Sequence, residues 1–315
     1  MSYSIHHVQE NGLNLVTLKD DKTGTAVSIL PQYGALLHSF SVETETGTFN
    51  IIDNYNSSAQ AKNEISKTFK SAKLSPFPCR ILEGKYSYHG RAAEFSRKFT
   101  DGSTIHGLLY DKAFSVIQEF ADESMASISL LYHYKNDDEG YPYKYKCHVR
   151  YSLHKDNFLQ IQTTVTNESQ DTIPIADGWH PYFQLGGSIN SWQLLFKSDS
   201  ILEFNDKLIP TGRLLKYDHF KDFQEIGSSE FDNCFVLNLD NGHAACELLN
   251  PGNKIKISFF PDNTYPYLQI FTPSHRKSIA IENLSAAPDC FNNNMGLTLL
   301  HPGHTKIFTV GYQVS

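Results

Sequence analysis

The sequence lacks the features that mark membrane-spanning, exported and nucleic-acid-binding proteins. No apolar run is long enough to cross a bilayer, and residues 1–12 contain neither a basic start nor an apolar stretch. The formal net charge is -7 and no long basic run occurs, which argues against binding to a phosphate backbone. We therefore expect a cytoplasmic protein with no membrane or nucleic-acid partner.

Cysteine is scarce, and the motifs that would hold a metal or a nucleotide are missing. The five cysteines are an odd number, and no two stand in a CxxC arrangement, which argues against a disulfide framework and a structural zinc site. The histidines show no HExxH or comparable spacing, and no glycine-rich nucleotide loop is present. The sequence therefore predicts no metal site and no cofactor.

Helical patterns are almost absent, and period-two alternation dominates instead. Apolar and polar side chains alternate over residues 126–134, 143–153, 159–165 and 255–259, with turn-forming residues between such runs. Only residues 57–70 suggest a helix. No linker, composition shift or repeat divides the chain. We therefore expect one all-β domain over residues 1–315, a large antiparallel β-sandwich with one short helix near residues 57–70.

The most informative stretch for function is residues 174–185, PIADGWHPYFQL. His180 follows Trp179 there and precedes the aromatic residues Tyr182 and Phe183. Imidazole changes charge near neutrality and suits proton transfer. Aromatic faces beside polar groups suit a sugar ring, because its C–H face is apolar. The stretch predicts a titratable group in an aromatic wall, and a buried structural histidine is the alternative.

Three further segments carry residues suited to binding or proton transfer. Arg80 ends Pro-Phe-Pro-Cys-Arg, where rigid prolines fix the direction of a guanidinium group that matches paired sugar oxygens. His106 precedes a glycine, which lets the backbone approach a ligand closely. Glu282 follows an apolar alternating strand, where burial raises the pKa of a carboxyl group. Each residue alone also fits a structural role: a surface arginine, a satisfied histidine and a strand-end glutamate in water.

Taken in order, these motifs resemble the aldose 1-epimerase (galactose mutarotase) family. The resemblance spans residues 31–312 and rests on segments 76–80, 106–108, 174–185, 231–232, 267–272, 279–282 with the Ala-Ala-Pro-Asp beyond it, and 300–303. Each segment is short, but together they are specific.

The resemblance implies a sandwich of the galactose mutarotase type, with a monosaccharide in an open cleft on one sheet. It implies an isomerase that interconverts the α and β anomers of a free aldohexose, such as glucose or galactose, without a cofactor. In that pattern Glu282 resembles the catalytic base and His180 the catalytic acid.

The expected sugar-binding residues stand on four separate segments. Arg80, His106 and Asp232 resemble residues that hold the sugar hydroxyls, and Tyr182 is expected to shape the wall. The match at Asp232 is a short Phe-Asp pair, and two other aspartates lie nearby, Asp222 and Asp240.

Three positions depart from the family pattern, and we expect all three to lie beside the sugar. Cys79 stands where asparagine usually precedes the arginine, and Phe114 stands where a tryptophan often follows the His-Gly segment. Asn283 replaces the proline that commonly follows the catalytic glutamate. These departures bear on which sugar is bound more than on the reaction.

Other functions remain compatible with the sequence. An epimerase of a hexose phosphate or an unusual aldose would need basic residues at the rim, for which Lys73, Lys85 and Arg91 are candidates. A non-catalytic carbohydrate-binding protein would not need an acid–base pair. A lyase or hydrolase shares the architecture, but hydrolysis ordinarily uses two carboxylates. Monomer and weak homodimer are both expected, because no apolar exposed stripe demands association.

Overall fold

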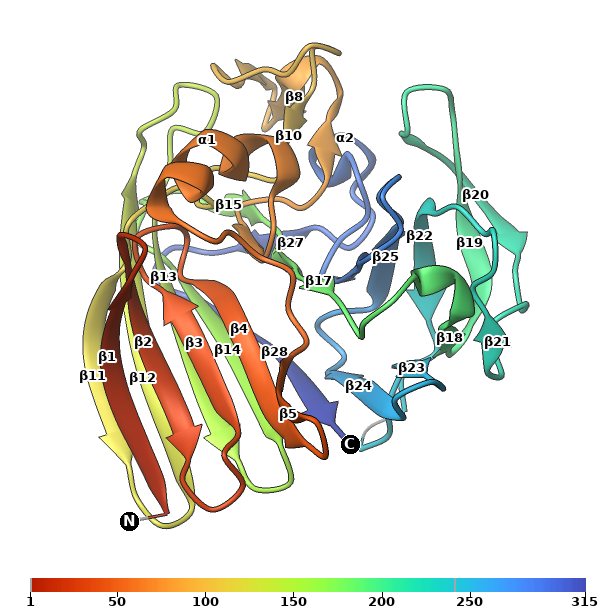
Figure 1. The fold of residues 1–315 in the computed structure, drawn as a ribbon. Coiled ribbons are helices and arrows are strands. Elements are labelled where there is room, and N and C mark those ends of the chain that lie inside the picture. The colour runs from red at the N-terminus through yellow and green to blue at the C-terminus, as the bar shows by residue number, and fades with distance from the viewer. Residues whose placement is uncertain (1, 241) are drawn as a thin grey trace.

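A computed structural model describes residues 2–240 and 242–315 and consists mainly of antiparallel sheets (Figure 1). The largest sheet has nine strands, and it contains all the alternating runs named above. In spatial order these are β11 (Ser115–Ala121), β12 (Met125–Lys135), β13 (Lys144–His154), β14 (Phe158–Asn167), β28 (Thr305–Val314), β24 (Ile255–Pro261), β23 (Cys246–Asn250), β18 (Gln193–Phe196) and β21 (Gln224–Glu225).

Two further sheets cover one face of this layer. The five-stranded sheet comprises β1 (Tyr3–Glu10), β2 (Leu13–Asp20), β3 (Ala26–Leu30), β4 (Leu36–Thr44) and β5 (Gly47–Asn50). It packs on the half formed by β11, β12 and β13, as the red-to-orange strands of Figure 1 show. Tyr151 of β13 joins both covering sheets, because its hydroxyl donates to the Ala35 carbonyl oxygen while its ring lies 5.9 Å from that of Trp179.

The eight-stranded sheet carries the residues expected to form the site. Its order is β20 (Pro210–Lys216), β19 (Ser198–Phe204), β22 (Asp232–Leu237), β25 (Tyr267–Phe271), β26 (Ile279–Leu284), β16 (Gly178–His180) and β6 (Ala72–Leu74), with β17 (Tyr182–Phe183) also paired to β26. Ile279 and Ile281 enter the core between the sheets. Period-two alternation therefore directs Glu282 to the opposite face.

Short elements cover the outer face of the eight-stranded sheet and the ends of the sandwich. Helix α1 (Ser58–Thr68) begins at Ser57, whose hydroxyl accepts from the Gln60 amide, and ends at Phe69 in a left-handed conformation. The other pieces are β7 (Arg80–Ile81), β8 (Lys85–Tyr88), β9 (Arg91–Glu94), β10 (Thr104–Ile105), β15 (Ile173–Ile175), β27 (Thr298–Leu300), α2 (Cys290–Asn293) and the 3-10 turns η1 (Leu82–Gly84) and η2 (Ile189–Ser191).

The predicted all-β sandwich and the helix near residues 57–70 are both confirmed. Helix α2 has four residues, too few to give a helical periodicity in the sequence. The five cysteines are free and buried. Within the described residues, no helix has the length and apolar character needed to cross a membrane.

Candidate active site

One cavity of about 240 Å³ is lined by all six residues expected to form the site. Its size is below the roughly 300–1,000 Å³ typical of sites for drug-sized ligands, which suits a single small molecule. The six residues come from five segments of the chain, since His180 and Tyr182 share one: Arg80, His106, His180, Tyr182, Asp232 and Glu282.

His180 and Glu282 form the centre of this cavity. They lie on the neighbouring strands β16 and β26, and 3.3 Å separates His180 Nε2 from Glu282 Oε1. His180 is 5% exposed and Glu282 only 1%. Glu282 lies within β26, not in water beyond its end. Within the described chain, His180 Nδ1 and Glu282 Oε2 are buried without a hydrogen-bond partner, so the pair retains unused capacity for a ligand.

Burial shifts both groups towards their neutral forms. It raises the pKa of the Glu282 carboxyl group well above its usual range, and the negative charge of Asp232 adds to this shift. Burial also lowers the pKa of His180 to about 4. Both shifts favour a proton on Glu282 over one on His180, and the 3.3 Å contact provides a path for a proton between the two groups.

His106 is held beside His180 by a close approach of two backbone segments. Leu108 donates its amide to the carbonyl oxygen of Ser75, and a Cβ on Gly107 would lie 2.2 Å from that same oxygen. Glycine is required there, which explains the His-Gly pair. The His106 ring meets the His180 ring edge-on at 4.8 Å. Burial lowers the pKa of His106, and the nearby His180 and Arg80 lower it further.

A polar floor continues from the central pair to Asp232. Gln269 of β25 is in register with Glu282 and donates Nε2 to Asp232 Oδ1 at 2.8 Å. Burial raises the pKa of Asp232, and Arg80 and Gln269 oppose that shift. Arg80 itself pairs with Asp101 at 2.9 Å. Among the described residues Asp232 lines the cavity, whereas Asp222 and Asp240 do not. Asp232 is therefore the aspartate at the site.

Gln269 was missed by the sequence reasoning. The signal was a polar residue at an alternating position, between Tyr267 and Phe271, on a strand otherwise rich in apolar residues. Its Oε1 atom is buried and has no partner among the residues that the structure describes, so it offers an acceptor to the cavity.

Aromatic side chains form the walls. The Tyr182 ring stacks on His180 at 5.1 Å, and Phe271 meets Tyr182 edge-on at 6.5 Å. Phe69, the residue that ends α1, lies 4.6 Å from the His106 ring. The remaining apolar and basic lining residues that the sequence did not reveal are Lys67, Ile105, Phe204, Leu208 and Pro288.

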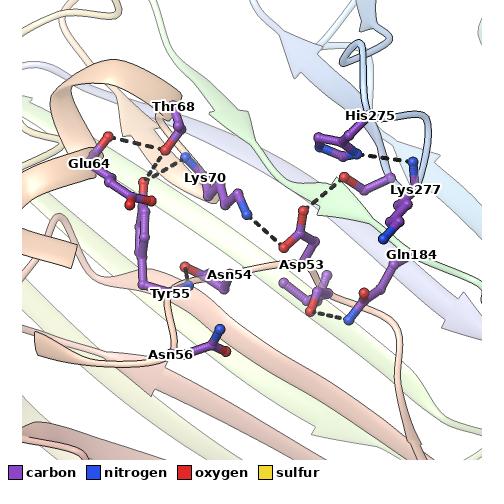
Figure 2. A network of polar contacts seen from close by, with 12 residues as sticks. Asp53, Asn54, Tyr55, Asn56, Glu64, Thr68, Lys70, Gln184, His275 and Lys277 are labelled. Atoms are coloured by element: carbon purple, nitrogen blue, oxygen red, sulfur yellow. Dashed lines mark hydrogen bonds and ion pairs between the residues drawn. The ribbon is translucent and has the colours of Figure 1, made fainter. Parts of the chain in front are cut away.

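A polar network, shown in Figure 2, anchors the end of α1, where Thr68 and Phe69 line the cavity. Lys70 Nζ donates to Asp53 Oδ1 at 2.7 Å, and Ser278 donates to the other Asp53 oxygen at 2.8 Å. The Asp53 amide donates to the Tyr182 carbonyl oxygen, and the Ser71 amide donates to that of His180. The network therefore fixes the wall residue Phe69 relative to the strand that carries His180.

The basic residues expected at the rim lie elsewhere. Lys73 is 0% exposed and pairs with Asp177 at 2.5 Å in the core, with its ammonium group 4.4 Å from the Trp179 ring centre. Alternation along β6 places Lys73 on the interior face, opposite the cavity. Lys85 and Arg91 lie on β8 and β9 and line two other hollows, one residue in each. None of these three candidates for a phosphate-binding rim therefore lines the cavity.

Only one of the three departures from the family pattern lines the cavity. Cys79 is the one that lines it. Burial raises the pKa of the Cys79 thiol well above the usual value, so this side chain presents a neutral, weakly polar surface to the cavity. Phe114 lies in the core. Asn283 is fully buried, and alternation along β26 turns it away from Glu282. The expectation that all three flank the sugar was therefore wrong for Phe114 and Asn283.

Comparison with known proteins gives one family and a set of similar folds. The sequence model of the aldose 1-epimerase family matches residues 14–313. The uncharacterized protein YihR of Escherichia coli is 23% identical over 245 residues, covering 75% of this chain and 77% of that protein. The bifunctional protein GAL10 of Kluyveromyces lactis is 24% identical over 189 residues, covering 55% of this chain and 27% of that protein.

Two solved structures are similar over nearly the whole chain. A galactose mutarotase-like protein from Clostridium acetobutylicum has a TM-score of 0.87 at 16% identity, covering 99% of this chain and 98% of that one. Galactose 1-epimerase from Lactobacillus acidophilus has a TM-score of 0.81 at 20% identity, again covering 99% and 98%. At these identities the likeness establishes the fold.

Proposed function

This chain belongs to the aldose 1-epimerase family, and we propose that it interconverts the α and β anomers of a free aldohexose of the glucose or galactose type. The observation that carries the proposal is the pair of His180 Nε2 and Glu282 Oε1, 3.3 Å apart in a cavity of monosaccharide size. Anomer exchange moves one proton from the anomeric hydroxyl and adds one to the ring oxygen. A buried carboxyl group and an imidazole in contact, between which a proton can move, match that requirement.

The reaction proceeds through an open-chain aldehyde. Glu282, as the carboxylate, takes the proton of the anomeric hydroxyl while the protonated His180 gives its proton to the ring oxygen, so the C1–O bond of the ring breaks. The C1–C2 bond rotates, and closure on the other face of the aldehyde returns both protons. Atoms, charge and electrons balance without a cofactor. Each group acts as acid in one direction and as base in the other.

Sugar binding itself favours the reactive arrangement of the proton. Burial raises the pKa of the Glu282 carboxyl group and so favours its protonated form. Sugar hydroxyls would donate to the carboxylate oxygens, and hydrogen bonds to the charged form lower the pKa of a carboxyl group. The proton then passes to His180 over a 3.3 Å contact. Arg80, His106, Asp232 and Gln269 would hold the other hydroxyls, while the Tyr182 ring covers the apolar C–H face.

The proposal is tested by following optical rotation or the anomeric proton signals of freshly dissolved α-D-glucose and α-D-galactose. The approach to equilibrium should accelerate in proportion to protein concentration. No acceleration with any free aldose would favour a non-catalytic carbohydrate-binding protein instead. Glucose 6-phosphate serves as the comparison for a phosphorylated substrate. We expect it to be the poorer substrate, because a phosphate group would find few basic partners. Among the described residues Lys67 is the one lysine that lines the cavity, and Lys73 is enclosed in the core.

A further inference from the structure

We propose that His106, His180 and Glu282 also form a binding site for a divalent transition-metal ion such as Zn²⁺, and that the ion and the sugar exclude each other. The mutual exclusion depends on the function proposed above, whereas binding of the ion does not. Sequence spacing gives no sign of this site, because its three residues are supplied by separate segments after β10, on β16 and on β26.

The spacing of the three side chains fits a metal ion. One ligand atom from each lies within 4.8 Å of the others. Zn²⁺ bonds of about 2.0–2.2 Å place two tetrahedral ligands roughly 3.3 Å apart. The His180 Nε2 to Glu282 Oε1 distance is 3.3 Å, so two ligands are already at this spacing. A tetrahedral site also requires the His106 ring to move closer to them, because the three ligand atoms are now up to 4.8 Å apart.

The donor set selects the class of ion. Two imidazoles and one carboxylate are a known set for Zn²⁺ with an open fourth position, whereas Mg²⁺ and Ca²⁺ prefer oxygen ligands alone. In the part of the chain described, His106 Nδ1, His180 Nδ1 and Glu282 Oε2 are buried without hydrogen-bond partners.

Neighbouring charged groups give the site a moderate affinity for a divalent metal ion. Asp232 adds a negative charge near Glu282, which favours a cation, while Arg80 adds a positive charge near His106. Metal-binding histidines usually donate their second nitrogen to a carboxylate or a carbonyl group, and loss of such a partner typically weakens binding about 10- to 100-fold. Among the described residues neither His106 nor His180 has that partner at Nδ1. We therefore expect a reversible, inhibitory ion and not a permanently bound one.

The test is a titration of the untagged, EDTA-treated protein with Co²⁺, whose visible absorption reports its coordination, followed by competition with Zn²⁺. We expect one equivalent to bind. His106→Phe retains a ring against Phe69 but removes a ligand, and it should weaken Co²⁺ binding at least about 10-fold. Glu282→Gln is a nearly isosteric second variant, which keeps the test decisive if His106→Phe does not fold.

His301→Gln is the matched control, because His301 and His304 form an exposed pair with rings 5.6 Å apart on a surface turn. It should leave Co²⁺ binding unchanged. Binding that survives both His106→Phe and Glu282→Gln would overturn the site. Saturating D-galactose should weaken Co²⁺ binding, and no effect would overturn mutual exclusion. A protein that binds Co²⁺ as expected but does not accelerate mutarotation would refute the proposed function and leave the metal site standing.

Discussion

Replacing Glu282 with glutamine changes one oxygen of a buried carboxyl group to an amide nitrogen, and we expect two effects of opposite kind. Turnover should be lost, because the amide cannot accept the proton of the anomeric hydroxyl. The fold should become more stable at neutral pH. The substitution preserves size and shape, so neither effect arises from a cavity in the sheet.

The loss of turnover follows from the distance between the two groups. Glu282 Oε1 lies 3.3 Å from His180 Nε2, so no other carboxylate at this site substitutes for it without moving a strand. A positioned acid or base typically contributes about 10²–10⁴-fold to the rate. We expect a decrease in kcat of that order, measured by optical rotation in EDTA. Sugar affinity should change little, because the glutamine side chain would still present a polar group of the same length.

The gain in stability follows from the raised pKa of Glu282. As the pH rises, the unfolded chain releases this proton first, while the folded protein retains it until the pH reaches the raised value. The unfolding free energy of the wild type therefore decreases across that interval, by up to about 1.4 kcal/mol per pH unit. The glutamine variant lacks this loss. Its advantage should be small near pH 4 and larger near pH 8, as measured by urea unfolding.

Glu225→Gln provides the control, since Glu225 is an exposed residue on the edge strand β21. It should alter neither turnover nor the pH dependence of unfolding. Normal turnover in Glu282→Gln would exclude the base role. A variant that is less stable than the wild type at pH 8, or whose advantage does not grow with pH, would refute the inference that burial keeps this carboxyl group neutral.

Three other predictions follow from the site and its supports. Because burial lowers the pKa of His180 to about 4, kcat/KM in EDTA should decline on the acid side near that pH as the His180 imidazole becomes protonated. A decline centred near the ordinary imidazole value of about 6.5 would contradict this. Lys73→Met removes the cation that pairs with the buried carboxyl group of Asp177. The substitution should reduce the unfolding free energy by about 3–5 kcal/mol, as measured by urea unfolding. An unchanged unfolding midpoint would disprove the buried pair. Asp53→Asn weakens the contact with Lys70 that holds the end of α1. In steady-state kinetics the substitution should raise KM more than it lowers kcat. A decrease in kcat alone would argue against a positioning role for Asp53.

The sequence predicts the nine-stranded sheet better than the eight-stranded sheet. Strands β12, β13 and β14 are ten or eleven residues long and have one face in the core, so their alternation is visible in the sequence. Strands β16, β17 and β6 have two or three residues each and are buried on both faces. No period can be read from so few residues. Their position in the sheet comes from the family resemblance and from tertiary packing.

The same limit explains which site residues were found. Recognisable motifs contain His180, His106 and Glu282, and these residue types indicate proton transfer or ligand binding. Gln269 gives only the weaker signal of a polar residue on an apolar strand, and Phe69 gives none. They reach the cavity through the register of β25 and the left-handed end of α1. Lys73 was misplaced at the rim because a three-residue strand does not reveal its inward face. The roles of all six predicted residues, the single domain and the oligomeric state stay predictions.

The register of β16 has a consequence for how the protein folds. Gly178 pairs with Leu284 on one side and with Leu74 on the other, so both neighbours of this three-residue strand are more than a hundred positions away along the chain. Contacts between such distant segments require closure of long loops and form slowly. A contiguous fragment that lacks β6 or β26 lacks one of the two strands between which β16 is held. Recovery of activity during refolding should therefore lag behind the recovery of strand structure, and it would report the moment at which the eight-stranded sheet closes.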